Sequence, residues 1–202
     1  MLKRVALGLR AHSGWAALVA IGGAADIPVV IQRRRLELAD CRIASAKQPY
    51  HAAEPMELKA AEKFLHGCAQ ATRAMAEPAL RGAVADLHGK GLTVIGACVL
   101  LASGRPLPDL AATLASHALI HTAEGEFYRD ALRKACECCG LAVTGIKERE
   151  LLNQASQRLG LSPNELGRRV SELGKGIGPP WTQDEKLCAM AGWVTLAGGL
   201  SG

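Results

Sequence analysis

Two histidines and a glutamate in the stretch HALIHTAEGE, residues 117–126, have the types and spacing of a chemical site. His117, His121 and Glu124 stand at positions i, i+4 and i+7, so on a helix they share one face. Two imidazoles and a carboxylate suit zinc or iron, so a divalent metal is the cofactor that this pattern predicts. The H-E-x-x-H pattern of zinc proteases is absent, because Ala and Leu follow the first histidine. Three interpretations stay open: a metal site, a catalytic or ligand-binding pocket without metal, and a packed helix surface.

Other polar residues extend this candidate site. His51 follows Tyr50 in the stretch QPYHAAE, which we expect to be a loop, and loops often carry functional residues. If His51 meets the histidine stripe, the two form one ligand-binding pocket. Asp184 begins the last predicted helix and is a candidate catalytic acid, although acids there also stabilise the helix dipole. Glu126 and Arg129 form an i, i+3 pair and are further ligand-binding candidates.

Two groups of arginines are candidates for binding nucleic acid. Arg33 and Arg35 lie on one face of a predicted strand, and Arg34 lies on the other. Arg168 and Arg169 lie on the second helix of a pair joined by a short glycine turn, which is typical of a helix-turn-helix. Arginines in such positions can contact phosphate groups.

The composition fits a globular protein with an aliphatic core. Apolar residues make up 49% of the 202 residues and aromatic residues only 3%, so Ala, Leu, Val and Ile must build this core. The net charge of +5 permits an acidic partner. The seven cysteines are odd in number and several fall in apolar runs, which indicates reduced thiols and a cytoplasmic location. No apolar run reaches 18 residues, so we expect no membrane-spanning helix.

The pattern of apolar residues predicts five strands and five helices. The strands are expected at residues 4–9, 14–23, 27–38, 92–103 and 141–146, and the helices at 56–88, 109–139, 147–160, 161–173 and 182–199. Pro78 should kink or split the first helix, and the almost wholly apolar fourth strand should be central in the sheet. The order β-β-β-α-β-α-β-α predicts an α/β fold with a mixed five-stranded sheet flanked by helices. Residues 1–202 should form a single domain, with a helical insertion at about residues 148–175 before the last helix.

This order resembles the ribonuclease-H-like superfamily, and the N-terminal stretch GLRAHSGWAALVAI resembles the first hairpin of its Holliday-junction resolvases. In those proteins a glycine-rich turn with an arginine leads to a Ser/Thr-Gly-aromatic triplet. The corresponding residues here are Arg10, a ligand-binding candidate, and Ser13-Gly14-Trp15. The family's final helix begins with an acid, and Asp184 stands where that acid would be.

The sequence departs from this family at its metal ligands. The resemblance implies two metal ions held by carboxylates, one from the first strand and another at or after the fourth. The stretches RVALGLRAH and VIGACVLLASGRP contain no acidic residue, and divalent ions of this kind need oxygen ligands. We therefore expect the fold without the standard two-metal nuclease activity.

Three functions follow from these observations. The leading prediction is a cytoplasmic ribonuclease-H-like protein that binds nucleic acid or a phosphorylated ligand. One alternative is a hydrolase that uses the His117, His121 and Glu124 cluster, with or without metal. The other alternative is an interaction protein with no active site. If the protein is an enzyme, its predicted class is hydrolase or nuclease.

Overall fold

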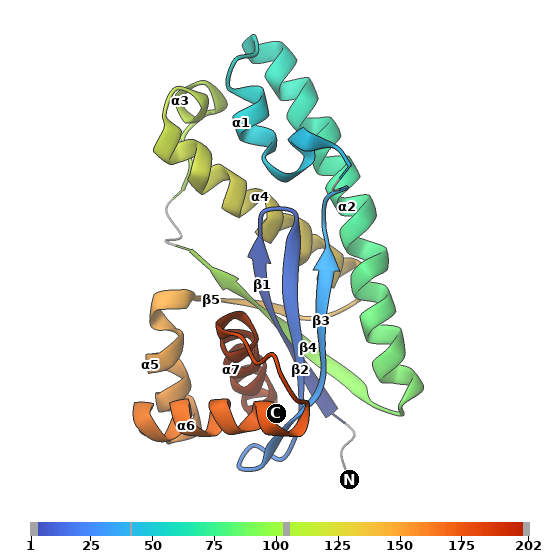
Figure 1. The fold of residues 1–202 in the computed structure, drawn as a ribbon, viewed down its shortest axis with the longest axis vertical. Coiled ribbons are helices and arrows are strands. Elements are labelled where there is room, and N and C mark those ends of the chain that lie inside the picture. The colour runs from blue at the N-terminus through green and yellow to red at the C-terminus, as the bar shows by residue number, and fades with distance from the viewer. Residues whose placement is uncertain (1–3, 41, 103–105, 200–202) are drawn as a thin grey trace.

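A mixed five-stranded sheet forms the centre of the protein (Figure 1). The computed structural model describes residues 4–40, 42–102 and 106–199, so Cys41 lies outside the described residues. The strands are β1 (Arg4–His12), β2 (Trp15–Gly23), β3 (Pro28–Glu37), β4 (Thr93–Leu101) and β5 (Val143–Lys147). Their order is β3-β2-β1-β4-β5. The first three strands form an antiparallel meander, whereas β4 and β5 run parallel to β1.

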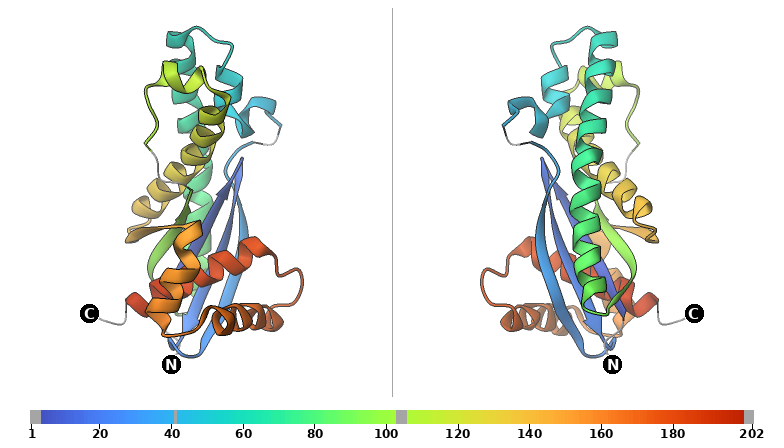
Figure 2. Two further views of the ribbon diagram at one scale, coloured as in Figure 1. Left: turned by 90° about the vertical axis from the view of Figure 1, so that its left-hand side faces the viewer. Right: turned by 90° about the vertical axis from the view of Figure 1, so that its right-hand side faces the viewer.

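Helices cover both faces of this sheet. The long elements are α2 (Leu58–Gly89), α4 (His117–Cys138), α5 (Glu148–Leu159), α6 (Pro163–Leu173) and α7 (Gln183–Gly198). The short ones are η1 (Ala44–Lys47), α1 (Pro49–Ala53), α3 (Leu110–Leu114) and η2 (Gly174–Gly176). Helices α2 and α4 pack on one face, and α7, supported by α5 and α6, packs on the other (Figure 2). Helices α1 and α3 and the first turns of α2 and α4 extend beyond the sheet (Figure 1).

Strand β1 is buried on both faces. Its alternation directs Val5, Leu7 and Leu9 toward α2 and α4, and Ala6 toward α7. Gly8 meets α7 at close range, because a Cβ there would lie 2.7 Å from the carbonyl carbon of Cys188 and closer still to its oxygen. A glycine at this position therefore lets α7 lie directly on the sheet.

The predicted strands and the order of the elements are confirmed, with four differences. The middle strand is β1 and not residues 92–103, although β4 is interior, since β5 covers its other edge. Helix α2 continues through Pro78, which is exposed, so water can hydrate the backbone carbonyl that proline leaves unbonded. The predicted helix 109–139 is two helices, because Asp109 caps α3 and Ser116 is extended. The expected loop around His51 is helical, with Pro49 at the first position of α1.

Within the described residues, no helix is both long and apolar enough to cross a membrane. The same part of the chain contains six cysteines, all of them free thiols: Cys68, Cys98, Cys136, Cys138, Cys139 and Cys188. Three of these are buried in the core, where burial raises the pKa of each thiol and keeps it protonated.

Candidate functional site

Charged side chains meet where the parallel strands end. Arg10 comes from the end of β1, Glu148 directly follows β5, and Asp184 lies in the first turn of α7. Arg10 Nε and Nη2 donate to Glu148 Oε2 and Oε1 at 2.9 and 3.1 Å, and Arg10 Nη1 donates to Asp184 Oδ1. The carboxyl edge of parallel strands is the place where open α/β sheets commonly bind ligands. Here a guanidinium joins two carboxylates at that edge.

The surroundings of Arg10 keep it charged. Its side chain is only 26% exposed, and burial disfavours the charged form. The Glu148 and Asp184 carboxylates outweigh this effect and raise the pKa of Arg10. The cluster therefore carries its own internal cation.

His12 and Trp15 lie beside this cluster. His12 Nε2 is 3.1 Å from Asp184 Oδ2 and accepts from Arg10 Nη1 at 3.2 Å. Burial lowers the pKa of His12, although the Asp184 charge opposes that shift. The His12 ring stacks on Trp15 with centroids 4.2 Å apart, and the Arg35 guanidinium lies 3.9 Å from the centre of the Trp15 ring. Neighbouring positions on β1, β2 and β3 thus form one row of stacked planar groups.

The arginines of β3 have different environments. Arg33 and Arg35 share one face of β3, as predicted, and this face meets α7. Arg34 faces the other way, where it pairs with Asp86 of α2. Arg33 donates to the carbonyl oxygens of residues 178–180 and lies 3.6 Å from Glu185, so it holds the loop before α7. Arg35 is 54% exposed, with Glu37 as its carboxylate partner at 2.6 Å. Arg35 is therefore more accessible than Arg33, the other arginine of β3 that was predicted to contact nucleic acid.

The predicted helix-turn-helix arginines are paired within their own helix. Arg168 contacts Glu165 at 2.8 Å and Glu172 at 2.7 Å, and Arg169 contacts Glu165 at 2.8 Å and donates to the Asp26 carbonyl at 3.1 Å. Hydrogen bonds from Arg168, which has the larger effect, and from Arg169 lower the pKa of Glu165 to about 2. A phosphate group would have to compete with these carboxylates.

The histidines predicted to form a pocket do lie together, beyond the end of the sheet. His51 of α1 meets His117 and His121 of α4, with ring centroids 5.5 and 4.7 Å away. The Nε2 atoms of His117 and His121 are 3.1 Å apart. Asp184 belongs to the Arg10 cluster and does not complete this group, contrary to one expectation from the sequence.

Glu124 lies behind the histidines and is only 4% exposed. Its Oε1 accepts from the backbone N–H groups of Tyr50 and His51 at 2.9 and 3.1 Å, and from His51 Nδ1 at 3.1 Å. Burial raises the pKa of Glu124, although these hydrogen bonds oppose the shift. Its Oε2 is buried with no hydrogen-bond partner among the described residues.

The predicted Glu126–Arg129 pair of α4 connects this helix to the sheet. Arg129 Nη1 donates to Glu126 at 3.1 Å, and Arg129 Nε donates to the carbonyl oxygen of Leu100 at 3.2 Å. Leu100 lies near the end of β4. This arrangement gives Arg129 a structural contact in addition to its predicted role in ligand binding.

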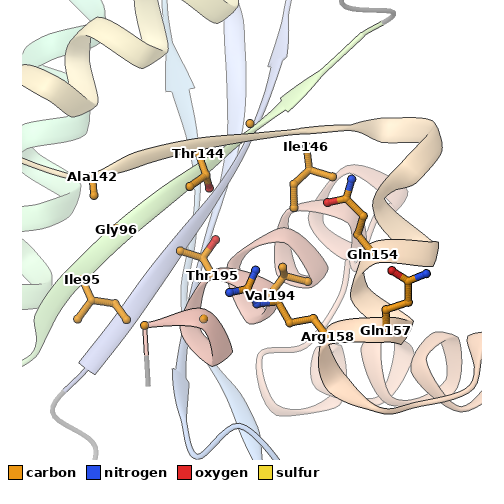
Figure 3. A pocket seen from close by; sticks show the side chains of 13 residues that line it. Ile95, Gly96, Ala142, Thr144, Ile146, Gln154, Gln157, Arg158, Val194 and Thr195 are labelled. Carbon is orange, nitrogen blue, oxygen red and sulfur yellow. The ribbon is translucent and has the colours of Figure 1, made fainter. Parts of the chain in front are cut away.

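The sequence did not indicate a pocket of about 790 Å³ between β4, β5, α5 and α7 (Figure 3). Its polar lining includes Thr144, Thr195, Gln154, Gln157 and Arg158. The last three lie at helical spacing on α5, which is the only local signal in the sequence. Arg158 has no ion-pair partner among the residues that the structure describes, so it is available to an anionic ligand.

The class of protein follows from the topology. The meander of β3, β2 and β1, extended by parallel β4 and β5 and covered by helices on both faces, is a ribonuclease-H-like fold, as the resemblance implied. The structure of Thermus thermophilus RuvC in complex with a Holliday junction substrate matches with a TM-score of 0.53 and 9% identity, covering 98% of this chain and 97% of that one. A second Thermus thermophilus RuvC structure matches with a TM-score of 0.50 and 12% identity, covering 96% and 93%. No protein-family model and no curated protein matches the sequence. At such low identity, the similarity establishes the fold alone.

Proposed function

We propose that this protein binds nucleic acid through its ribonuclease-H-like domain and does not cleave it by two-metal catalysis. The observation that carries this proposal is the position of Arg10 at the end of β1, bonded to both Glu148 and Asp184. The guanidinium lies among the acids at the carboxyl edge of the sheet, where the resemblance implies metal ions.

The residues at this edge do not fit a pair of divalent metal ions. Such ions need several oxygen ligands, and β1 and β4 contain no acidic residue. The two carboxylates that are present already bind Arg10. A metal ion would have to displace this guanidinium or share the carboxylates with another positive charge. We therefore derive no metal-dependent cleavage step.

Three observations support nucleic acid as the partner. A protein of similar fold has been solved in complex with a Holliday junction substrate. The chain has a net charge of +5. Arg35 is half exposed beside the Arg10 cluster, so its guanidinium can reach a phosphate group while its carbon chain stays in place. Arg33 and Arg169 are assigned a smaller part because they are less exposed than Arg35, at 25% and 35%. Arg168 is as exposed as Arg35 but pairs with two carboxylates, whereas Arg35 pairs with one.

The test is the salt dependence of binding to labelled duplex, single-stranded and four-way-junction DNA, measured by fluorescence anisotropy. Each phosphate that the protein neutralises makes the negative slope of log K against log salt steeper by about 0.9 for duplex DNA. We expect Arg35→Gln to lower the slope for the duplex by about this amount. Arg81→Gln is the matched control, since Arg81 is 58% exposed and pairs with one carboxylate, that of Glu77 on α2. No binding at low salt, or equal slopes for the two variants, would contradict the proposal.

Cleavage is tested on the same DNA substrates in the presence of Mg²⁺ or Mn²⁺. We expect intact DNA after prolonged incubation. If the wild-type protein cleaves DNA in a metal-dependent way, and copurifying nucleases do not explain the cleavage, then Arg10 is compatible with catalysis. A preparation of the Glu148→Gln/Asp184→Asn double variant purified in parallel identifies such contamination, since contaminating activity would persist in it although both carboxylates that bind Arg10 are gone.

The pocket shown in Figure 3 supports a second candidate function, the binding of a small phosphorylated ligand. Arg158 would contact the phosphate, and Gln154 and Gln157 would hydrogen-bond the rest of the molecule. A thermal melt with a nucleoside monophosphate should then show stabilisation that Arg158→Gln abolishes. Arg133→Gln is the control, because Arg133 lies on α4 and does not line this pocket. An equal shift for both variants would exclude binding in this pocket.

A further inference from the structure

We propose that His51, His117 and His121 form a binding site for Zn²⁺, and that Glu124 positions His51 for it. Each histidine offers one ligand atom, and these atoms all lie within 4.8 Å of one another. The site lies where α1 meets the start of α4, and it shares no residue with the Arg10 cluster. It goes beyond the nucleic-acid binding proposed above.

The three rings have the arrangement that a shared metal ion requires. They are steeply inclined to one another, with interplanar angles of 81°, 66° and 82°, so they converge and do not stack. Zinc–nitrogen bonds of about 2.0–2.1 Å in a tetrahedron place neighbouring nitrogens about 3.3 Å apart. The Nε2 atoms of His117 and His121 are 3.1 Å apart, close to that value. A small movement of His51 would complete the set.

The fold itself brings these rings together. His117 and His121 are one turn apart on α4, and Ser116 begins this helix in an extended conformation. Helix α1 is held beside them by the buried Ala53 and by Tyr50, whose ring meets Phe127 edge-on at 6.2 Å. Apolar packing therefore positions His51 next to α4, and the site is largely preformed.

Glu124 gives His51 the correct tautomer for metal binding. Its carboxylate accepts from His51 Nδ1, which leaves the lone pair of His51 Nε2 available for a metal ion. Carboxylate–histidine–zinc arrangements of this kind orient the ring and make the imidazole a stronger ligand. The role differs from that predicted from the sequence, in which Glu124 was itself a ligand. Among the described residues, the group of mutually close ligand atoms contains the three histidines and not Glu124.

Charge also favours a cation here. Glu124 is buried, with His51 as its only ion-pair partner among the described side chains, and its Oε2 is unpaired. A buried carboxylate is stabilised by a nearby positive charge. The partial positive charge at the start of α4 opposes a cation, and the negative charge of Glu124 offsets that effect.

The ligand types select the metal. Three imidazoles without oxygen or sulfur ligands suit Zn²⁺ and similar transition-metal ions and disfavour Mg²⁺ and Ca²⁺. Three protein ligands leave the fourth tetrahedral position open, as in catalytic zinc sites. His117 and His121 are exposed, so water can reach that position.

The experiment is calorimetric titration of the chelator-treated full-length protein with Zn²⁺, in the absence of nucleic acid. We expect one Zn²⁺ per chain. Co²⁺ should bind at the same site and give the visible absorption of a tetrahedral complex. His51→Gln and His121→Gln should each weaken binding at least tenfold. Glu124→Gln should weaken it by roughly 10–100-fold, as is typical when a residue that orients a ligand is changed.

His88→Gln is the matched control, since His88 is an exposed histidine at the end of α2 and should be replaceable without effect. A circular dichroism melt of each variant separates loss of the site from loss of the fold, and the exposed His121 is the safest variant in this respect. If His51→Gln binds Zn²⁺ as tightly as wild type, only a surface pair on α4 is involved and the three-ligand site is wrong. Absence of stoichiometric binding by the wild type also overturns it, and either result leaves the nucleic-acid proposal unaffected.

Discussion

Replacing Arg10 by glutamine should destabilise the protein, because it removes the cation that Glu148 and Asp184 share. The carboxylates would then repel each other at the edge of the sheet. Glutamine can still donate a hydrogen bond, so the change tests mainly the loss of charge.

The size of the effect follows from the exposure of the cluster. Exposed ion pairs contribute about 0–1 kcal/mol, and breaking a buried pair costs about 3–5 kcal/mol. Arg10 is 26% exposed and contacts two carboxylates, which places it between these limits. We expect a loss of about 2 kcal/mol in the free energy of unfolding. In a chain of this length, that corresponds to a decrease of about 4–8 °C in the melting temperature.

Urea unfolding and thermal melts at neutral pH measure this loss. A double-mutant cycle with Asp184→Asn separates the ion pair from unrelated effects, because the double variant no longer contains one of the unpaired charges. We expect the double variant to be more stable than additivity of the two single changes allows. A single variant within about 0.5 kcal/mol of wild type, or strictly additive changes, would show that the guanidinium does not hold these acids together.

Three further predictions concern other parts of the fold. Burial holds the pKa of His12 below its usual value, so the unfolded chain takes up a proton at a higher pH than the folded one, and stability falls as the pH drops below about 6.5. His12→Gln should therefore make the unfolding free energies at pH 7 and pH 5 more nearly equal, and an unchanged difference between these two free energies would contradict this. Glu165 has a pKa of about 2, so its ion pairs stabilise the protein at pH values above its unfolded pKa near 4.5, and this contribution is lost as the pH falls toward 2. The difference in unfolding free energy between wild type and Glu165→Gln should therefore narrow in acid, and a difference that does not change with pH would refute the pairing. Gly8→Ala should lower the free energy of unfolding by about 3 kcal/mol or more, because its Cβ would overlap the backbone of α7. Gly67→Ala, whose Cβ would meet no packing neighbour within 4 Å among the described residues, should instead stabilise α2 by roughly 0.5–1 kcal/mol. Equal melting temperatures for these two variants would contradict the close packing of Gly8 on α7.

Local patterns in the sequence predicted the strands and the long helices, but not the position of each strand in the sheet. The segments that became β1 and β4 are both strongly apolar, and apolarity indicates burial without identifying neighbours. The sheet order depends on where α2 and α4 return the chain. Similarly, Pro78 predicts a break, but α2 continues through it, and its exposed position on the helix is not visible in the local sequence.

The candidate sites were predictable to different degrees. Spacing alone placed His117 and His121 together, because both lie on one helix. His51 was a separate candidate, and only tertiary packing brings α1 to that helix. The same packing buries Glu124 and leaves the two histidines accessible, which helical spacing cannot show. Glu148 was missed, although an acid directly after a parallel strand is a signal in its own right.

The central position of β1 has a consequence for the synthesis of the chain. One edge of β1 pairs with β2 within the first hairpin, but its other edge pairs with β4, as in the pairing of Leu7 with Ala97. Roughly 90 residues separate those partners, and a ribosome that adds about 5–20 residues per second needs between about 5 and 18 s to make them. During that interval a nascent meander would present an unpaired apolar edge, which is the kind of edge that joins to strands of other chains. Chaperone demand and aggregation of truncated chains should therefore be greatest for products that end before β4.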